Sequence, residues 1–281
     1  MSWPGGKGAD GVYQRLISQI PPHQVYIEGC LGGGAILKHK KPARVSLAFD
    51  LDGAALDSFD SGGLTTQGVS VNRSKHRWGD PMAYLELWKY SPEPVVELIE
   101  ADVLVALQHG RKNLDHHCFI YLDPPYLRST RKSSAPLYRF EWTEEQHQTM
   151  LQLVKTLPAR VMISGYWSEL YAQALSDWRM VSFTAQTRQG PATEYVWMNY
   201  PEPKELHDYR YLGRDWIDRQ RIRRKAQRWV QKLKSLPTQE RYAILDALNS
   251  YLGQTGLASA AGLDIPDYGR DPSQDQLGKP V

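Results

Sequence analysis

Short apolar runs alternate with amphipathic stretches through the first 200 residues of the chain. Residues 25–27, 46–49, 118–122 and 161–163 are strand-sized, and each run ends in glycine, aspartate or a Ser-Gly pair. The stretches between them carry apolar side chains at helical spacing, as residues 143–157 do. This alternation predicts an α/β fold built on a doubly wound, mainly parallel sheet, with ligands bound at the carboxyl ends of the strands.

Three parts of the chain do not follow this alternation of strand and helix patterns. Residues 180–185 and 195–200 have no helix between them and predict a closing antiparallel strand pair. Residues 60–96 are polar and rich in turn-forming residues, which favours an insertion outside the sheet. Residues 201–203, Pro-Glu-Pro, indicate a linker.

Beyond the linker the pattern is helical. Ile222, Ala226, Trp229, Val230 and Leu233 share one face of a predicted helix, Pro237 interrupts it, and Thr238 caps a second helix. We therefore expect a catalytic domain of residues 1–59 and 97–203, a short insertion of 60–96, a basic helical hairpin within 204–260, and a loose tail of 261–281.

Composition narrows the class of protein. With 281 residues and 41% hydrophobic residues the chain can fill a core, and no apolar run reaches the length of a membrane span. The amino terminus has no apolar signal core, and the two cysteines, Cys30 and Cys118, exclude a disulfide framework and a four-cysteine zinc site. These features predict a soluble, cytoplasmic protein that needs no metal and contacts no membrane.

The net charge of +3 is unevenly distributed. Residues 209–234 contain ten basic side chains against two aspartates, so the remainder of the chain is net acidic. A basic segment on a near-neutral body indicates a polyanionic partner, although a solvated helix face explains the charge equally well.

The most specific motif is Asp123-Pro124-Pro125-Tyr126, directly after an apolar strand. Two prolines fix the backbone, so a carbonyl can point into a site instead of pairing. A carboxylate beside that carbonyl suits an –NH2 group, and the tyrosine ring offers a face on which a base can stack. The alternative is a strand-ending turn with an exposed aspartate.

A second motif is the glycine loop, residues 28–35, which joins a predicted strand to a predicted helix. Glycines such as Gly29 and Gly32 let a ligand approach the backbone, and Asp50 closes the next strand, where an acid can hold ribose hydroxyls. No Gly-Lys-Ser/Thr sequence follows, which disfavours a phosphate-gripping loop and favours a nucleoside cofactor.

These motifs, together with Pro4-Gly5-Gly6-Lys7, occur in the order seen in Dam-type DNA adenine-N6 methyltransferases, and the chain resembles that family over roughly residues 2–200. The resemblance implies a class I methyltransferase-like fold and S-adenosylmethionine as cofactor. It implies that Asp123 lies between cofactor and target amine, with Pro124, Pro125 and Tyr126 completing the catalytic motif. The cofactor-binding residues that it implies are Trp3, Lys7, Glu28, Gly29, Gly32, Asp50, Asp102 and Asp123.

Hydrogen bonds from adenine N6–H to Asp123 and to the Pro124 carbonyl would localise the nitrogen lone pair and aim it at the cofactor's methyl group. The base must first leave the duplex. The insertion is shorter than the recognition domain of Dam-type members, so we expect a short or relaxed recognition site. The expected DNA contacts are Arg73, Lys75, Arg77 and Trp78 in the insertion, and Arg221, Arg223, Arg224 and Arg228 in the helical part.

Two other functions stay open at this stage. The same catalytic motif serves RNA adenine methyltransferases, so double-stranded DNA is the expected partner and RNA the alternative. The departure of Gly29-Cys30 from the family's Pro-Phe and the basic segment also fit a non-catalytic DNA-binding protein with a methylase fold. The sequence allows a monomer or a weak dimer, and leaves open a role in restriction-modification, phage biology or regulation.

Overall fold

The computed structural model describes residues 6–61, 69–74, 85, 93–131, 135–187 and 190–255. It divides the chain into two compact units, Met1–Arg219 and Gln220–Val281. Each unit is described by itself below.

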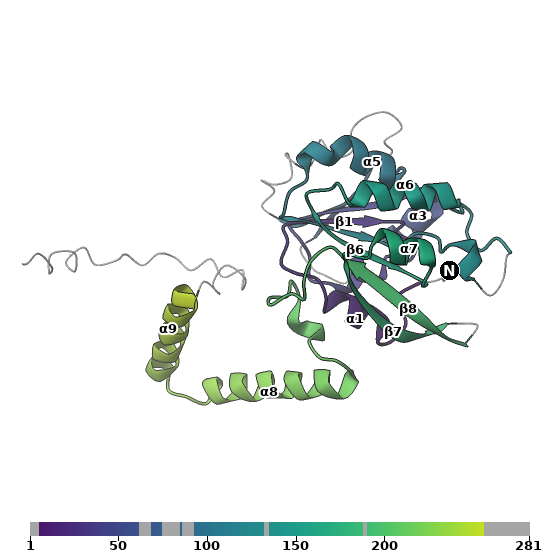
Figure 1. Ribbon diagram of the computed structural model, residues 1–281. Helices are drawn as coiled ribbons and strands as arrows, with labels where there is room; N and C mark the ends of the chain where they lie inside the picture. The colour runs from purple at the N-terminus through teal and green to yellow at the C-terminus, as the bar shows by residue number, and fades with distance from the viewer. Residues whose placement is uncertain are drawn as a thin grey trace, which may run out of the picture. The chain divides into compact units, whose positions relative to one another are not determined.

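The first unit is built on one eight-stranded sheet with the order β3-β4-β2-β1-β5-β6-β8-β7 (Figure 1). All neighbouring pairs are parallel except those made by β8, which runs antiparallel to β6 and to β7. The predicted fold class, a mainly parallel sheet closed by an antiparallel pair, is confirmed. The strands are β1 Val25–Gly29, β2 Val45–Asp50, β3 Ser70–Ser74, β4 Val95–Glu100, β5 Cys118–Leu122, β6 Arg160–Gly165, β7 Arg179–Thr187 and β8 Gly190–Met198.

Helices cover both faces of this sheet, because alternate strand residues point to opposite sides. Ile27 and Leu47 belong to one buried cluster with residues of α5, α6 and α7, whereas Tyr26 and Ala48 belong to a second cluster with residues of α1, α2 and α3. The helices are α1 Val12–Ile17, α2 Ala35–His39, α3 Gly53–Ser61, α5 Val103–His109, α6 Glu144–Val154 and α7 Glu169–Ala174, with 3-10 turns at Gly110–Asn113, Arg128–Thr130 and Tyr209–Tyr211.

Two expectations about the borders of the domains need correction. Residues 70–74, assigned to an insertion outside the sheet, form the edge strand β3 and pair in parallel with β4. Val69 and Val71 pack against the core beneath that strand, and this apolar alternation is too short to stand out in a polar stretch. Residues 204–219 belong to the first unit, where Asp208 accepts a hydrogen bond from Lys41 N (2.8 Å).

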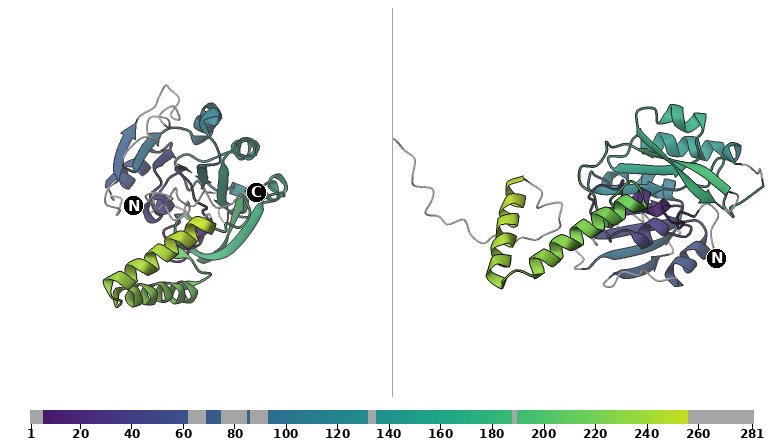
Figure 2. Two further views of the ribbon diagram at one scale, coloured as in Figure 1. Left: turned by 90° about the vertical axis from the view of Figure 1, so that its left-hand side faces the viewer. Right: turned by 90° about the horizontal axis from the view of Figure 1, so that it is seen from below.

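The predicted carboxyl-terminal helices are present as α8, Trp216–Lys234, and α9, Thr238–Thr255, with Pro237 between them. Figures 1 and 2 show their ribbons leading away from each other at the bend. Ala226, Trp229 and Val230 of the predicted apolar stripe are exposed, and Ile222 and Leu233 are half-buried. Among the described residues, no helix has the length and apolar character needed to cross a membrane.

Candidate active site

The carboxyl edge of the sheet opens into a cavity of about 970 Å³. The ends of β1, β2, β4 and β5 and the middle of β8 all contribute to its lining, as expected for a doubly wound sheet. The cavity brings together eight of the site residues that the sequence predicted: Lys7, Glu28, Gly32, Asp50, Asp102, Asp123, Pro125 and Tyr126.

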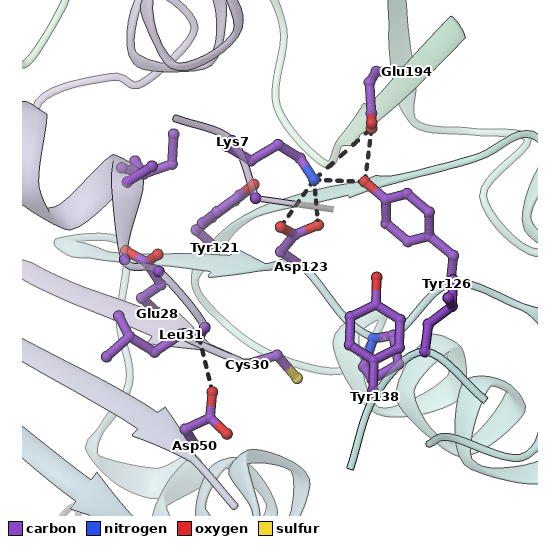
Figure 3. Close-up of a pocket in the computed structure, with 18 of the residues that line it drawn as sticks. Lys7, Glu28, Cys30, Leu31, Asp50, Tyr121, Asp123, Tyr126, Tyr138 and Glu194 are labelled. Atoms are coloured by element: carbon purple, nitrogen blue, oxygen red, sulfur yellow. Dashed lines mark hydrogen bonds and ion pairs between the residues drawn. The ribbon is translucent and has the colours of Figure 1, made fainter. Parts of the chain in front are cut away.

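At one end of the cavity the Lys7 ammonium binds the carboxylate of Asp123 (Figure 3). Lys7 Nζ lies 2.8 and 2.9 Å from the two Asp123 oxygens and also donates to the Tyr126 hydroxyl. Burial acts to lower the pKa of Lys7, but the charges of Asp123 and Glu194 outweigh it and raise that pKa above its ordinary value. The buried lysine is therefore an ammonium ion.

Glu194 completes this cluster from β8. Its Oε2 accepts a hydrogen bond from the Tyr126 hydroxyl (2.8 Å) and lies 3.9 Å from Lys7 Nζ. Burial raises the pKa of Glu194, while the Lys7 ammonium works in the opposite direction. Two carboxylates thus share one ammonium group in a buried site.

Asp123 is also held from the opposite direction. Ser164, near the end of β6, donates to Asp123 Oδ1 (2.8 Å), and the Tyr121 hydroxyl pairs with Ser164 Oγ (2.8 Å). Ser164 and Tyr121 are fully buried, so the position of the carboxylate is set by the sheet itself. Such a chain of hydrogen bonds fixes the carboxylate before any ligand arrives.

The glycine loop and Asp50 form the other end of the cavity. Asp50 Oδ2 accepts from Gly32 N (2.8 Å), and Oδ1 accepts from Asp52 N (2.8 Å). Gly34, in the left-handed region at φ +60°, sits so close to Phe59 that a Cβ would lie 2.4 Å from its ring. Burial raises the pKa of Asp50, and the two backbone hydrogen bonds partly offset that rise.

Asp102 and Glu28 also line the cavity. Asp102 caps α5 by accepting from Leu104 N (2.8 Å). Glu28 Oε2 accepts from the Tyr26 hydroxyl (2.7 Å) and from Leu37 N (3.1 Å). Burial raises the pKa of Glu28 to about 7, because the carboxylate loses water and faces the charge of Asp123.

Two of the expected site residues, Gly29 and Pro124, do not line the cavity. Gly29 does not line the cavity; a Cβ there would lie 2.6 Å from Leu122 Cδ2 and 2.9 Å from Val103 Cγ2. Pro124 is likewise absent from the lining, whereas Pro125 and Tyr126 belong to it. Cys30, the residue after Gly29, adopts φ +59° and contributes its half-buried side chain to the cavity.

A loop after the Asp-Pro-Pro-Tyr motif covers part of the cavity. Arg131 binds both carboxylate oxygens of Glu141 (2.9 and 2.6 Å) and donates to the Tyr126 carbonyl. Arg139 from the same loop pairs with Asp52 (3.2 Å), and Tyr138 lines the cavity. The loop therefore links the ends of β5 and β2, with the glycine loop of β1 between them.

Sequence reasoning missed Glu194, Ser164 and the 135–142 loop. Glu194 could have been identified as a candidate site residue from the sequence, because it is the single acid in a strand otherwise made of neutral residues. Ser164 followed an apolar strand, as Asp123 and Asp50 do, and so satisfied the rule that identified those two residues.

Among the residues expected to contact DNA, Arg73 does not line the cavity. Arg73, on β3, binds Asp57 and lies 3.7 Å from Glu100; its contact with DNA stays a prediction. Arg221, Arg223, Arg224 and Arg228 on α8 are exposed, and their contact with DNA also stays a prediction. Trp3, Lys75, Arg77 and Trp78 lie outside the described residues. Within the part of the chain that the structure covers, no three metal-binding side chains come together.

No protein-family model and no curated protein sequence matches the chain. Among solved structures it is similar to precorrin 8w decarboxylase of Methanobacterium thermoautotrophicum, with 12% identity over 69% of this chain and 91% of that chain, at a TM-score of 0.38. An rRNA methylase from Streptococcus thermophilus shares 12% identity over 66% of this chain and 93% of its own, at a TM-score of 0.36.

A third similar structure is TrmK of M. capricolum in complex with S-adenosyl-homocysteine, with 8% identity over 86% of this chain and 95% of that chain, at a TM-score of 0.37. Likenesses this weak carry no information about the substrate of this chain. The function proposed below therefore rests on the residues of the cavity.

Proposed function

We propose that the protein is an S-adenosylmethionine-dependent methyltransferase that modifies the N6 amino group of adenine in DNA, as its resemblance to Dam-type enzymes implies. The observation that carries this proposal is the fixed carboxylate of Asp123 at one end of a cavity whose other end is the glycine loop with Asp50. The end with Asp123 suits an amine that receives a methyl group, and the end with Asp50 suits the nucleoside part of the cofactor.

The residues of the cavity fit this cofactor. Asp50 presents a carboxylate to ribose hydroxyls, and Asp102 presents one to the amino group of the cofactor's adenine. When bound, S-adenosylmethionine supplies an electrophilic methyl group on a positively charged sulfur. The lining favours a cation, because it contains the acids Glu28, Asp50, Asp52, Asp102, Asp123 and Glu194 against the bases Lys7, Arg131 and Arg139.

The Asp-Pro-Pro-Tyr motif fits the acceptor. The Asp123 carboxylate accepts an N–H of the target amine, which concentrates the nitrogen lone pair and orients it. Tyr126 and Tyr138 line the same cavity and offer aromatic faces for a base taken out of its stack. A volume of about 970 Å³ is large enough for a cofactor and a base together.

Duplex DNA is the proposed substrate and RNA adenine the second candidate. The exposed basic side chains of α8 support a polynucleotide of either kind, because phosphate contacts carry no sequence information. A DNA-binding protein without activity is the third reading; the intact Lys7, Asp123 and Tyr126 cluster argues against it.

One assay tests the proposal. Labelled methyl transfer from S-adenosylmethionine should be measured on duplex DNA, single-stranded DNA and RNA of the same sequence, followed by mapping of the modified adenines. We expect label at adenine N6 in duplex DNA at short or varied sites. Label in RNA alone would favour the second candidate, and label in no polymer would contradict the proposal.

A further inference from the structure

Lys7 and Ser164 both donate hydrogen bonds to the carboxylate of Asp123. Lys7 Nζ covers both oxygens of Asp123 at 2.8 and 2.9 Å, and Ser164 occupies Oδ1 as well. The proposed chemistry needs the same carboxylate to accept an N–H from the substrate. A carboxylate has about four acceptor positions, and these contacts occupy three of them, so an amine that binds Oδ2 shares that oxygen with the ammonium group. Movement of Lys7 away from Oδ2 would leave that oxygen to the amine.

Lys7 is the member best able to move. Asp123 accepts a hydrogen bond from Ser164, which in turn pairs with the Tyr121 hydroxyl, and both of these residues are fully buried. The Tyr126 hydroxyl donates to Glu194. The lysine has a second acceptor close by, because Glu194 Oε2 lies only 3.9 Å from Nζ. The Tyr126 hydroxyl touches both groups and lies on the route between them.

We infer that Glu194 is a positioning residue that receives the Lys7 ammonium group when the amine of the target base takes its place at Asp123. This inference rests on the proposed function. The exchange leaves the buried charge unchanged, because one ammonium group serves two carboxylates both before and after it. Burial raises the pKa of Glu194 and the ammonium group opposes that rise, so the approach of Lys7 favours the ionised acceptor.

A direct test measures binding of adenosine by calorimetry in the presence of S-adenosylhomocysteine. Glu194→Gln keeps an oxygen for the Tyr126 hydroxyl but removes the charge that attracts the ammonium group. We expect adenosine affinity to fall by about tenfold, since a lost charge-assisted contact is worth roughly that much, while S-adenosylhomocysteine affinity stays nearly constant. Glu194→Asp, which keeps the charge, should restore most of the loss.

A double-mutant cycle separates this role from a merely structural one. In a Lys7→Gln background there is no ammonium group to receive, so Glu194→Gln should cost little further affinity for adenosine. Additive losses in the cycle, or unchanged adenosine affinity in Glu194→Gln, would overturn the inference. Glu202→Gln, at an exposed acid that follows β8 and does not line the cavity, serves as the matched control.

The wild-type protein supplies a second measurement if a variant fails to fold. A crystal structure with adenosine and S-adenosylhomocysteine should place Lys7 Nζ within hydrogen-bond distance of Glu194 and the adenosine amine at Asp123. Lys7 still bound to both Asp123 oxygens, or no binding of adenosine at all, would refute the exchange. Absent methyl transfer with a normal adenosine complex would instead refute only the proposed function.

Discussion

Arg131 and Glu141 form a bidentate ion pair with N···O distances of 2.9 and 2.6 Å. This pair closes the loop that follows the Asp-Pro-Pro-Tyr motif. The same guanidinium donates to the Tyr126 carbonyl, and Glu141 Oε1 accepts from the backbone N–H groups of Leu137 and Tyr138. Burial acts to raise the pKa of Glu141, but the bonds from Arg131 and the backbone outweigh it and lower that pKa to about 2. This pair therefore fixes both the loop and the backbone of Tyr126.

Glu141→Gln should destabilise this loop, while the side chains of Lys7, Asp123 and Tyr126 stay in the cavity. The change removes the charge that Arg131 faces, and we expect the free energy of unfolding to fall by about 1.5–3 kcal/mol, the usual range for a hydrogen bond to a charged group. Chemical denaturation would measure the loss. Glu145→Gln, in the exposed first turn of α6, is the control and should leave the free energy nearly unchanged.

Asp123→Asn should abolish methyl transfer while S-adenosylhomocysteine binding persists. Asparagine has nearly the same shape, but its neutral amide accepts an N–H far less strongly than a carboxylate does, and it leaves Lys7 with a weaker partner. We expect the turnover rate to fall at least about a hundredfold, the scale typical of losing a preorganised polar contact to reacting atoms. Asp177→Asn, in an exposed ion pair with Lys155, is the matched control. Wild-type turnover in the Asp123 variant would place the chemistry elsewhere.

Gly29→Ala should destabilise the fold even though Gly29 does not face the cavity. The added methyl would lie 2.6 Å from Leu122 Cδ2 and 2.9 Å from Val103 Cγ2, both in the packed core. Overpacking of this kind costs about 1–3 kcal/mol, measurable as a lower thermal midpoint. At Gly165 a methyl meets only Trp197 at 3.8 Å, so Gly165→Ala should be tolerated. Equal stability of the two variants would contradict the packing argument.

The sheet and the site residues at its carboxyl edge could be predicted, because both follow from short apolar runs and the polar residues that end them. Asp50 and Asp123 each end an apolar run, and the carboxyl ends of parallel strands meet at one edge whatever the connecting loops do. The strand Ser70–Ser74 escaped notice because only two valines, Val69 and Val71, mark its buried side.

The interior partners of the site residues could not be predicted. Lys7 meets Asp123, which is 116 positions away, and Tyr126 meets Glu194 across 68 positions. No periodicity in a single sequence encodes such pairings, since they depend on where the amino-terminal segment and strand β8 come to lie relative to β5 in the folded unit. The resemblance assigned Lys7 to the cofactor, whereas in the structure Lys7 binds the carboxylate of Asp123.

Stability should depend on pH through His147, which is buried beneath the loop and pairs with the Tyr171 hydroxyl (2.8 Å). Burial and the nearby Arg131 lower the pKa of His147 to about 4. An unfolded histidine titrates near 6.5, so the unfolded chain binds more protons between pH 6.5 and 4, and stability is lost as pH falls through that window. Between pH 6.5 and 5 the loss should be about 1–2 kcal/mol.

Urea unfolding at a series of pH values measures this dependence. His147→Gln keeps a side-chain acceptor for Tyr171 but cannot take up a proton, so its stability should fall less steeply below pH 6.5. His116→Gln, at an exposed turn, should keep the wild-type slope. Parallel curves for His147→Gln and the wild type would show that His147 does not carry the effect.

The basic face of α8 should bind the phosphate backbone. Arg221, Arg223, Arg224 and Arg228 are exposed, and changing all four to Gln should weaken DNA binding by the same factor for every sequence. With each phosphate contact that is lost, DNA binding releases fewer counterions. The slope of log affinity against log salt concentration should therefore flatten by about 0.9 per lost contact. Fluorescence anisotropy over a salt series measures both effects.

The matched control for α8 uses Arg111→Gln and Lys112→Gln, two exposed bases in the turn that follows α5, at the amino-terminal edge of the sheet. Parallel strands bind their ligands at the opposite edge, so this pair should leave the salt slope unchanged. A second explanation for α8 is a dimer that pairs the stripe containing Trp229 and Val230, which leave about half of their surface exposed. Light scattering separates the two, because loss of phosphate contacts leaves the molar mass constant. An unchanged salt slope with a shift from dimer to monomer would assign the helix to self-association.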